Sequence, residues 1–232
     1  MMVQPGNRRR FVATLAGLPV ALSSSRWLAA ADEAATPAVP ADQGLQRLLE
    51  GNKRFVAGNL TSVGNLAQDR AKMANGQSPF AVIVSCSDSR VPPEIIFDQT
   101  FGQLFVVRTA GQVVDEAARS SITFGVEALG ASLLLVLGHS GCGAVEAALA
   151  ALQGKPIPGF AYRFAEGIGP AAQSVLNQPG DQLDNAIRAN VMQGVDQMKS
   201  AEPDLAAAVR SGKLTVAGGH YDLASGEVTI LS

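Results

Sequence analysis

The sequence predicts an α/β fold, with one domain built on a mainly parallel central β-sheet and helices on its faces. Short, continuous runs of apolar and often β-branched residues recur along the chain, as in strands covered on both sides. Segments with helical apolar spacing separate these runs. The 232 residues are 47% hydrophobic, which is enough for a sizeable core and excludes wholesale disorder.

Residues 1–31 have the features of an export signal. They contain four arginines and no acidic residue, and Arg8 and Arg9 stand next to each other before a mildly apolar stretch at 11–22. Alanines at 29–31 offer a small-residue cleavage site. The pattern resembles a twin-arginine signal, an address that the export machinery recognises, and it predicts a periplasmic or otherwise exported protein. A basic arm or a retained anchor is the alternative, although the stretch is too short to span a bilayer.

Residues 32–41 are rich in Ala and Pro and are expected to form a flexible linker before a domain at 42–232. Removal of residues 1–31 takes away four of 18 basic residues and no acidic one. The formal charge therefore changes from −2 to −6. Trp27, the only tryptophan, would leave with the signal. Neither charge gives the basic field that nucleic-acid binding requires.

In the first half of the domain, a helix is expected at 42–56, where leucines recur with helical spacing and Asp42 is a candidate N-cap. Buried strands are then expected at three apolar runs. A crossover helix is expected between the second and third runs, and an Ala-rich helix after the third. These predicted elements are strands at 80–84, 104–107 and 133–137 and helices at 116–129 and 142–152.

In the second half, many Gly and Pro residues at 154–180 predict a loop-rich connection. Asp181 is expected to cap a helix whose apolar stripe ends at Met198. Two closing strands are expected at 214–217 and 228–231, joined by a turn at Ala224-Ser225-Gly226.

Polar side chains gather at the ends of two predicted strands. One cluster, at 85–90, follows the first strand, and the other, at 138–143, follows the third. Both cysteines and one of the two histidines lie in these clusters. Ligands of such sheets bind beyond the carboxyl ends of the strands. If the two strands are neighbours, the clusters meet.

Together the clusters supply the thiols of Cys86 and Cys142 and the imidazole of His139, with Asp88 close to the first cysteine. Two sulfurs and one nitrogen suit tetrahedral zinc, which leaves a fourth position for water or a carboxylate. The spacing His139-x-x-Cys142 allows both side chains to reach one ion from a turn that enters a helix. The residues therefore predict a zinc site.

Three other interpretations of these residues stay open at this point. The segment 138–142 nearly matches the G-x-S-x-G elbow of serine hydrolases, but its last residue is Cys142. Its glycines could cradle a phosphate, although no G-K-[ST] motif is present. Cys86 and Cys142 could form a structural disulfide in an exported protein, which would leave His139 and Asp88 without a role.

The segment 86–90 (CSDSR) is followed, 53 positions after its cysteine, by 139–142 (HSGC). With this pattern the chain resembles the beta-class carbonic anhydrases. The resemblance extends from about Leu45 to Leu231. It implies a dimeric beta-carbonic-anhydrase-like fold and the reversible hydration of CO₂ to bicarbonate and a proton by a zinc-bound hydroxide. Three further segments share the resemblance: GNKRFVAGN at 51–59, RVPPEIIFDQ at 90–99 and LFVVRTAGQ at 104–112.

The resemblance implies one Zn²⁺ per subunit, bound by Cys86, His139 and Cys142. Asp88 would pair with Arg90 and either orient a zinc-bound water or fill the fourth zinc position itself. Without the resemblance, Asp88 and Arg90 would be interpreted as an ordinary ion pair.

The resemblance also implies substrate-binding residues. Gln77 would hydrogen-bond the substrate from the partner subunit of a homodimer or a larger dimer-based assembly. Phe105 and Phe124 would line the CO₂ pocket, although core packing alone explains them equally well. His220 is either a proton shuttle or a strand-end histidine without a catalytic role.

Some members of the family switch off at low pH through a bicarbonate site built from Trp, Arg and Tyr. Arg108 and Tyr221 match two of these residues, but Ile83 stands in the Trp position. The sequence therefore predicts the plant-like subtype that is not locked by bicarbonate. The functional alternatives are a zinc hydrolase of the same fold acting on CS₂ or COS, and a non-catalytic zinc-stabilised binding module.

Overall fold

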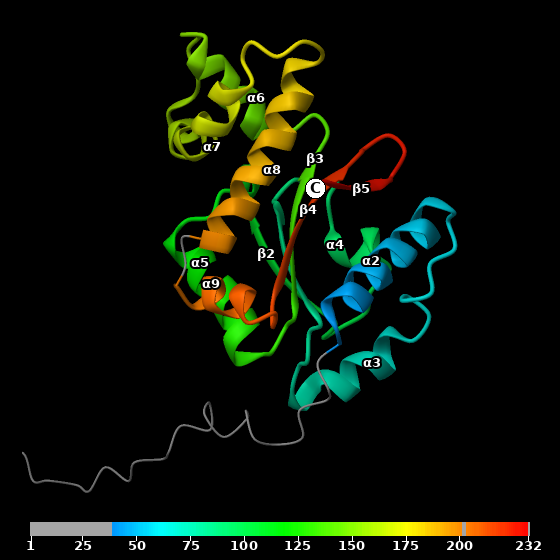
Figure 1. Ribbon diagram of the computed structural model, residues 1–232. Coiled ribbons are helices and arrows are strands. Elements are labelled where there is room, and N and C mark those ends of the chain that lie inside the picture. Colours follow the sequence, from blue (N-terminus) through cyan, green and yellow to red (C-terminus); the bar gives the residue numbers. More distant parts are fainter. Residues whose placement is uncertain (1–38, 201–202, 232) are drawn as a thin grey trace, which may run out of the picture. The chain divides into compact units, whose positions relative to one another are not determined.

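The computed structural model describes residues 39–200 and 203–231 (Figure 1). All described residues belong to one compact unit. The predicted signal and most of the predicted linker lie outside the described residues. In the described ranges, no helix is both long and apolar enough to cross a membrane.

The core of the fold is one five-stranded sheet with the strand order β2-β1-β3-β4-β5. The first four strands in this order are parallel, and β5 pairs antiparallel with β4. The predicted α/β class and all five predicted strands are therefore confirmed. The strands are β1 (Ala81–Cys86), β2 (Leu104–Thr109), β3 (Leu133–His139), β4 (Thr215–Tyr221) and β5 (Val228–Leu231).

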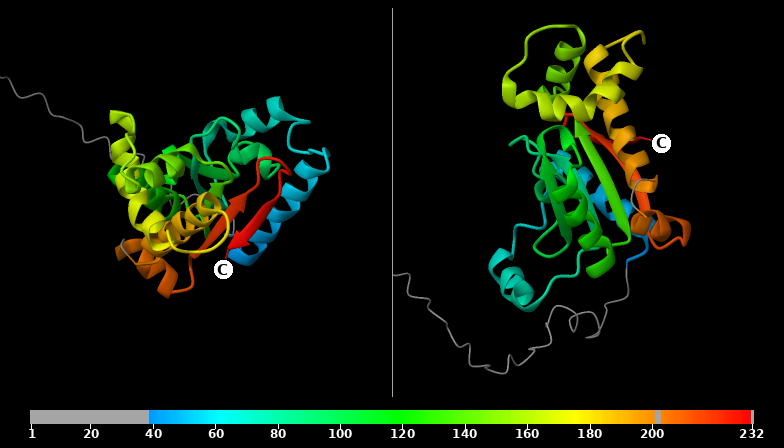
Figure 2. Two further views of the ribbon diagram at one scale, coloured as in Figure 1. Left: turned by 90° about the horizontal axis from the view of Figure 1, so that it is seen from above. Right: turned by 90° about the vertical axis from the view of Figure 1, so that its left-hand side faces the viewer.

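Helices cover both faces of the sheet (Figures 1 and 2). Leu134 and Val136 of β3 pack with residues of α5, α8 and α9. Leu133 and Leu135 point to the other face, where α2 and α4 pack. The helices are α2 (Ala41–Val56), α3 (Leu66–Lys72), α4 (Pro93–Ile96), α5 (Glu116–Thr123), α6 (Gly143–Leu152), α7 (Tyr162–Ser174), α8 (Gln182–Ser200) and α9 (Pro203–Arg210).

A third apolar cluster lies at the carboxyl edge of the sheet. It joins α6, α7 and the beginning of α8, and it includes both cysteines. In both views of Figure 2, α6 and α7 lie together at one end of the domain. This cluster excludes water from one side of the polar residues that follow β1 and β3.

The predicted first helix is confirmed, but the prediction that Asp42 caps it is wrong. The helix begins at Ala41, its N-cap is Pro40, and no side chain caps it. The Gly44 N–H donates to the Pro40 carbonyl at 2.8 Å, so the backbone itself closes the first turn. Asp42 lies inside that turn, where its charge complements the helix dipole.

Asp181 caps α8 as predicted. Its Oδ1 accepts hydrogen bonds from the Leu183 N–H at 2.9 Å and the Asp184 N–H at 3.2 Å. The predicted crossover helix is also confirmed. It runs through α5 and continues as a single π-helical turn at Phe124–Ala128.

The predicted loop at 154–180 is wrong, because much of it forms α7. Ala165, Ile168 and Ala172 lie on a buried stripe of this helix, and Ile168 and Ala172 are fully buried. Gly167 allows close packing, since a Cβ there would lie 2.9 Å from Cγ1 of Val113. Tertiary packing thus overrides the weak helix propensity of the segment. The short helices α3, α4 and α9 have no counterpart in the sequence prediction.

Candidate metal centre

Because β1 and β3 are parallel neighbours, the polar residues that follow them meet at one edge of the sheet. The Sγ atoms of Cys86 and Cys142 and a ring nitrogen of His139 all lie within 4.8 Å of one another. All three residues are buried. It is the one group of this kind in the described ranges. The predicted convergence of the two clusters is therefore confirmed.

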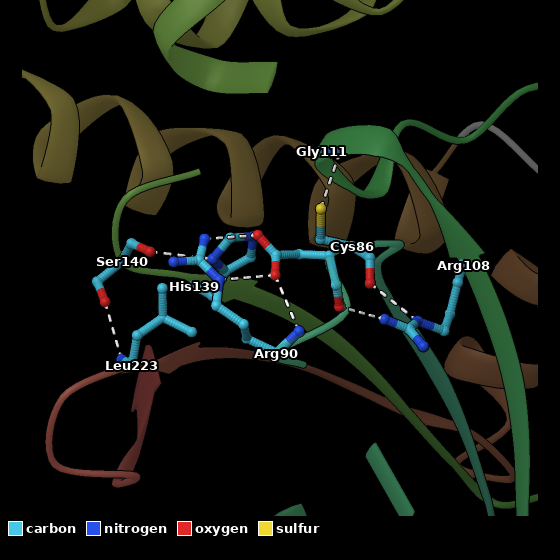
Figure 3. Close-up of polar contacts among 8 residues, drawn as sticks. Cys86, Arg90, Arg108, Gly111, His139, Ser140 and Leu223 are labelled. Carbon is cyan, nitrogen blue, oxygen red and sulfur yellow. Dashed lines mark hydrogen bonds and ion pairs between the residues drawn. The ribbon is translucent and has the colours of Figure 1, made fainter. Parts of the chain in front are cut away.

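The backbone orients the imidazole of His139. Its Nδ1 lies 3.0 Å from the Ser140 carbonyl oxygen, so Nδ1–H is the donor and Nε2 presents a lone pair. Ser140 is itself fixed, because its Oγ accepts the Leu223 N–H at 2.9 Å (Figure 3). Nε2 is buried and has no hydrogen-bond partner. A buried lone pair without a partner is what a metal ligand offers.

The two cysteines are free and buried. The Cys142 thiol donates a hydrogen bond that lowers the pKa of Cys86 to about 4, and the same pairing raises the pKa of Cys142. The Gly111 N–H also donates to the Cys86 Sγ at 3.3 Å. One thiolate and one thiol beside an imidazole fit zinc, whose charge deprotonates a coordinating thiol. The free thiols do not support the disulfide interpretation.

Asp88 and Arg90 form a two-pronged ion pair close to His139. Arg90 donates from Nε to Oδ1 at 2.9 Å and from Nη2 to Oδ2 at 2.7 Å. These hydrogen bonds hold the pKa of Asp88 well below its usual range, so the carboxylate stays ionised at any working pH. Its Oδ2 lies 4.0 Å from His139 Nε2. The carboxylate therefore lies next to Nε2, the ring nitrogen without a hydrogen-bond partner.

Arg108 contacts the same turn from β2. Its Nε donates to the Cys86 carbonyl at 2.9 Å and its Nη2 to the Asp88 carbonyl at 2.5 Å. Sequence reasoning identified Arg108 only as a match to a bicarbonate site and missed these contacts. It also missed the Gly111 contact, for which a glycine four residues after the second predicted strand was the available signal. Ile83 and Tyr221, at the other two positions compared with that bicarbonate site, are both buried.

Gln77, Phe105 and Phe124 lie apart from the cysteines within one chain. Phe105 pairs in the sheet with Val82, four residues before Cys86, which is roughly 13 Å along a strand. Its ring centroid lies 6.1 Å from that of Phe124, which is 41% exposed. Gln77 is exposed and precedes β1. Within one chain, these three residues therefore do not reach the group formed by Cys86, His139 and Cys142, here called the metal-ligating group.

His220 also lies outside the metal-ligating group. Its Nε2 is 3.2 Å from Oδ1 of Asp184, in a cavity that Ser140 and Gly141 also line. Burial lowers the pKa of His220 below its ordinary value. The ring is therefore neutral at neutral pH.

The fold and this site define the class of the protein, an α/β domain with a metal-binding type of donor set, two cysteines and one histidine, at the carboxyl edge of a parallel sheet. A carbonic anhydrase family model matches residues 81–228. Carbonic anhydrase 2 of Mycobacterium tuberculosis is 39% identical over 184 residues, which cover 79% of this chain and 89% of that protein. A carbonic anhydrase of Mycolicibacterium smegmatis is 38% identical over 186 residues, or 80% and 90%.

Solved structures agree with the sequence relatives. The beta-carbonic anhydrase of Coccomyxa, solved with acetazolamide, matches with a TM-score of 0.66 and 28% identity over 81% of this chain and 86% of that one. The beta-carbonic anhydrase CcaA matches with a TM-score of 0.62 and 26% identity over 82% and 95%. The chain belongs to the beta-class carbonic anhydrase family. It is an enzyme that interconverts CO₂ and bicarbonate.

Proposed function

We propose that the chain performs CO₂ hydration with one zinc ion held by Cys86, His139 and Cys142. The observation that carries this proposal is the convergence of three buried donors, one of them a nitrogen without a partner. When bound, zinc lowers the pKa of a water molecule toward about 7, a magnitude taken from carbonic anhydrases with three histidine ligands. Metal analysis with a CO₂ hydration assay tests the proposal. One zinc per chain and hydration abolished by a chelator are expected, whereas full hydration by a zinc-free chain would refute it.

In this proposal Asp88 accepts a hydrogen bond from the attacking water. This bond directs the lone pair of the water oxygen toward CO₂. The two-pronged pair with Arg90 supports this role, because both carboxylate oxygens are held in a fixed plane. It also disfavours Asp88 as the fourth zinc ligand, since an oxygen that leaves Arg90 gives up a short ionic hydrogen bond. Arg90 thus fixes the carboxylate and keeps it charged.

We also propose that Gln77, Phe105 and Phe124 serve the site of a second copy of the chain in a homodimer. Their separation from Cys86 within one chain supports this arrangement. So does the exposure of Gln77 and Phe124, which leaves both free to meet another surface. Gln77 would donate to the developing carboxylate oxygen, and the two aromatic rings would enclose an apolar molecule that offers only weak hydrogen-bond acceptors.

Mixed dimers test which chain Gln77 serves. Chains with Gln77→Ala and chains with Cys86→Ser are each expected to have low activity. A dimer of one of each should regain about half of the activity of the unmodified dimer, because one zinc-bearing site meets an intact Gln77. Stopped-flow hydration after subunit exchange measures this. Mixed dimers no more active than the average of the two parents would contradict the proposal, and remixed parental chains are the control.

We propose that the enzyme is of the plant-like subtype without a bicarbonate lock. Ile83 supplies no indole at the matched position, and Arg108 already donates to two carbonyls. Activity is therefore expected to fall smoothly as pH decreases, with a midpoint that added bicarbonate leaves unchanged. Rate profiles between pH 6 and 9, with and without bicarbonate, measure this. A sharp loss near neutrality that bicarbonate enhances would count against the assignment.

Finally, we propose export through the twin-arginine route to the periplasm or beyond the cytoplasm. The support is the sequence of residues 1–31 alone. That route carries folded proteins, so zinc could bind before the thiols meet an oxidising compartment. Changing Arg8 and Arg9 together to lysine is expected to keep the protein in the cytoplasm, as fractionation would reveal. Normal export of that variant would refute the proposal.

A further inference from the structure

Arg108 makes two hydrogen bonds to the turn that carries both Cys86 and Asp88. It lies on β2, and its guanidinium reaches across to the end of β1 (Figure 3). Nε donates to the Cys86 carbonyl at 2.9 Å, and Nη2 donates to the Asp88 carbonyl at 2.5 Å. The two acceptors are two residues apart, so one planar fork spans the turn from the metal ligand to the carboxylate.

Guanidinium chemistry suits this task. Its donors are fixed in one plane, so two carbonyls bound to it are held in a defined relative orientation. A lysine ammonium at the same position could satisfy one carbonyl strongly but would not define the angle between the two. Hydrogen bonds from a charged donor are also stronger than those between neutral groups. Arg108 therefore restricts the turn more than a backbone contact does.

The remaining bonds of the turn do not replace this restraint. The Ser87 N–H donates to the Thr109 carbonyl at 2.9 Å, and the Val91 N–H donates to the Asp88 carbonyl at 3.0 Å. The first fixes the turn at one point only. The second comes from the same loop and would move with it. The bond from Arg108 to Asp88 is the contact that ties this carbonyl to the sheet.

We propose that Arg108 is a positioning residue for CO₂ hydration, which fixes the turn from Cys86 to Asp88 so that the carboxylate stays beside the metal-ligating nitrogen of His139. Asp88 is thereby held at both ends. Arg90 binds its carboxylate, and Arg108 binds its carbonyl. The inference rests on the proposed role of Asp88 and adds a residue that acts only through it.

A double-mutant cycle tests this inference. Arg108→Gln is expected to lower kcat/KM about tenfold in the parent chain but less than about twofold in an Asp88→Asn chain, because the residue acts through that carboxylate. Arg108→Lys should lower kcat/KM less than Arg108→Gln does, because an ammonium can still bind one of the two carbonyls. Arg163→Gln, an exposed arginine on α7, is the matched control and should leave kcat/KM unchanged. If Arg108→Gln does not fold, the cycle is run with Arg108→Lys.

The second measurement is independent of activity. The Arg90 N–H donates to Asp88 Oδ1 at 2.9 Å, so its solvent exchange reports how well Asp88 is held. Exchange of this amide, followed by NMR in the zinc-free and zinc-loaded chain, should become at least about threefold faster in Arg108→Gln. Equal losses in both backgrounds, or unchanged exchange of the Arg90 amide, would overturn the inference. Full activity of Asp88→Asn would instead refute the role of Asp88.

Discussion

Replacement of Cys86 by serine is expected to remove zinc from the protein and to lower CO₂ hydration by about a thousandfold or more. The pKa of the Cys86 thiol is lowered, because Cys142 and the Gly111 N–H both donate to its sulfur. A serine hydroxyl has a far higher pKa and is a poor zinc ligand. The remaining thiol and imidazole would hold the ion only weakly.

Zinc content by atomic emission and stopped-flow hydration rates measure the effect of Cys86→Ser. Cys142→Ser should behave in the same way, because it removes the second sulfur from the same group. Ser89→Ala, an exposed change in the same loop, is the control for local disturbance and should retain both zinc and activity. A Cys86→Ser chain that keeps a full complement of zinc and its activity would refute the ligand assignment.

Replacement of Asp88 by asparagine has the second-largest expected effect. The change preserves shape but removes the charge, and one carboxylate acceptor becomes an N–H donor that faces the donors of Arg90. We expect zinc content to be unchanged and kcat/KM to fall about a hundredfold. A loss of this size is typical when a side chain that positions a proton of the reacting group is removed. The result separates the orienting role from a ligand role, because loss of a ligand would also lower zinc content.

A matched control for Asp88→Asn is available on α8. Asp184 pairs with Arg188 at 2.7 Å, the same distance as the shorter contact between Asp88 and Arg90. Asp184→Asn removes an ion pair with one such contact, outside the group of Cys86, His139 and Cys142, so the hydration rate should remain close to that of the parent. Equal losses in the two variants would attribute the effect of Asp88→Asn to general electrostatics and contradict its specific role.

The fold could be predicted because the strands of this sheet are recognisable in the sequence as short apolar runs. The run at 133–137 is apolar without interruption, since its strand is covered on both faces. The segment that became α7 carries glycines and Pro170, whose local preferences oppose a helix. Its helical form depends on packing against α6 and α8, which no local pattern encodes.

The convergence of Cys86, His139 and Cys142 could be predicted because scarce residue types cluster at two strand ends, and parallel neighbours bring such ends together. The contacts of Arg108 could not, because they depend on the side of β1 on which β2 lies and on the direction of one long side chain. The resemblance implies that Gln77 and Phe105 contact the substrate. The register of β1 and β2 is what reveals the separation of Phe105 from Cys86 within one chain.

The most direct test of the central claim is zinc K-edge X-ray absorption of the purified enzyme. If Cys86, His139 and Cys142 hold the ion, the spectrum should fit two sulfur donors at about 2.3 Å with nitrogen or oxygen donors at about 2.0–2.1 Å. The imidazole of His139 should add its multiple-scattering signature. A first coordination shell without sulfur, or one with a single sulfur, would contradict the account.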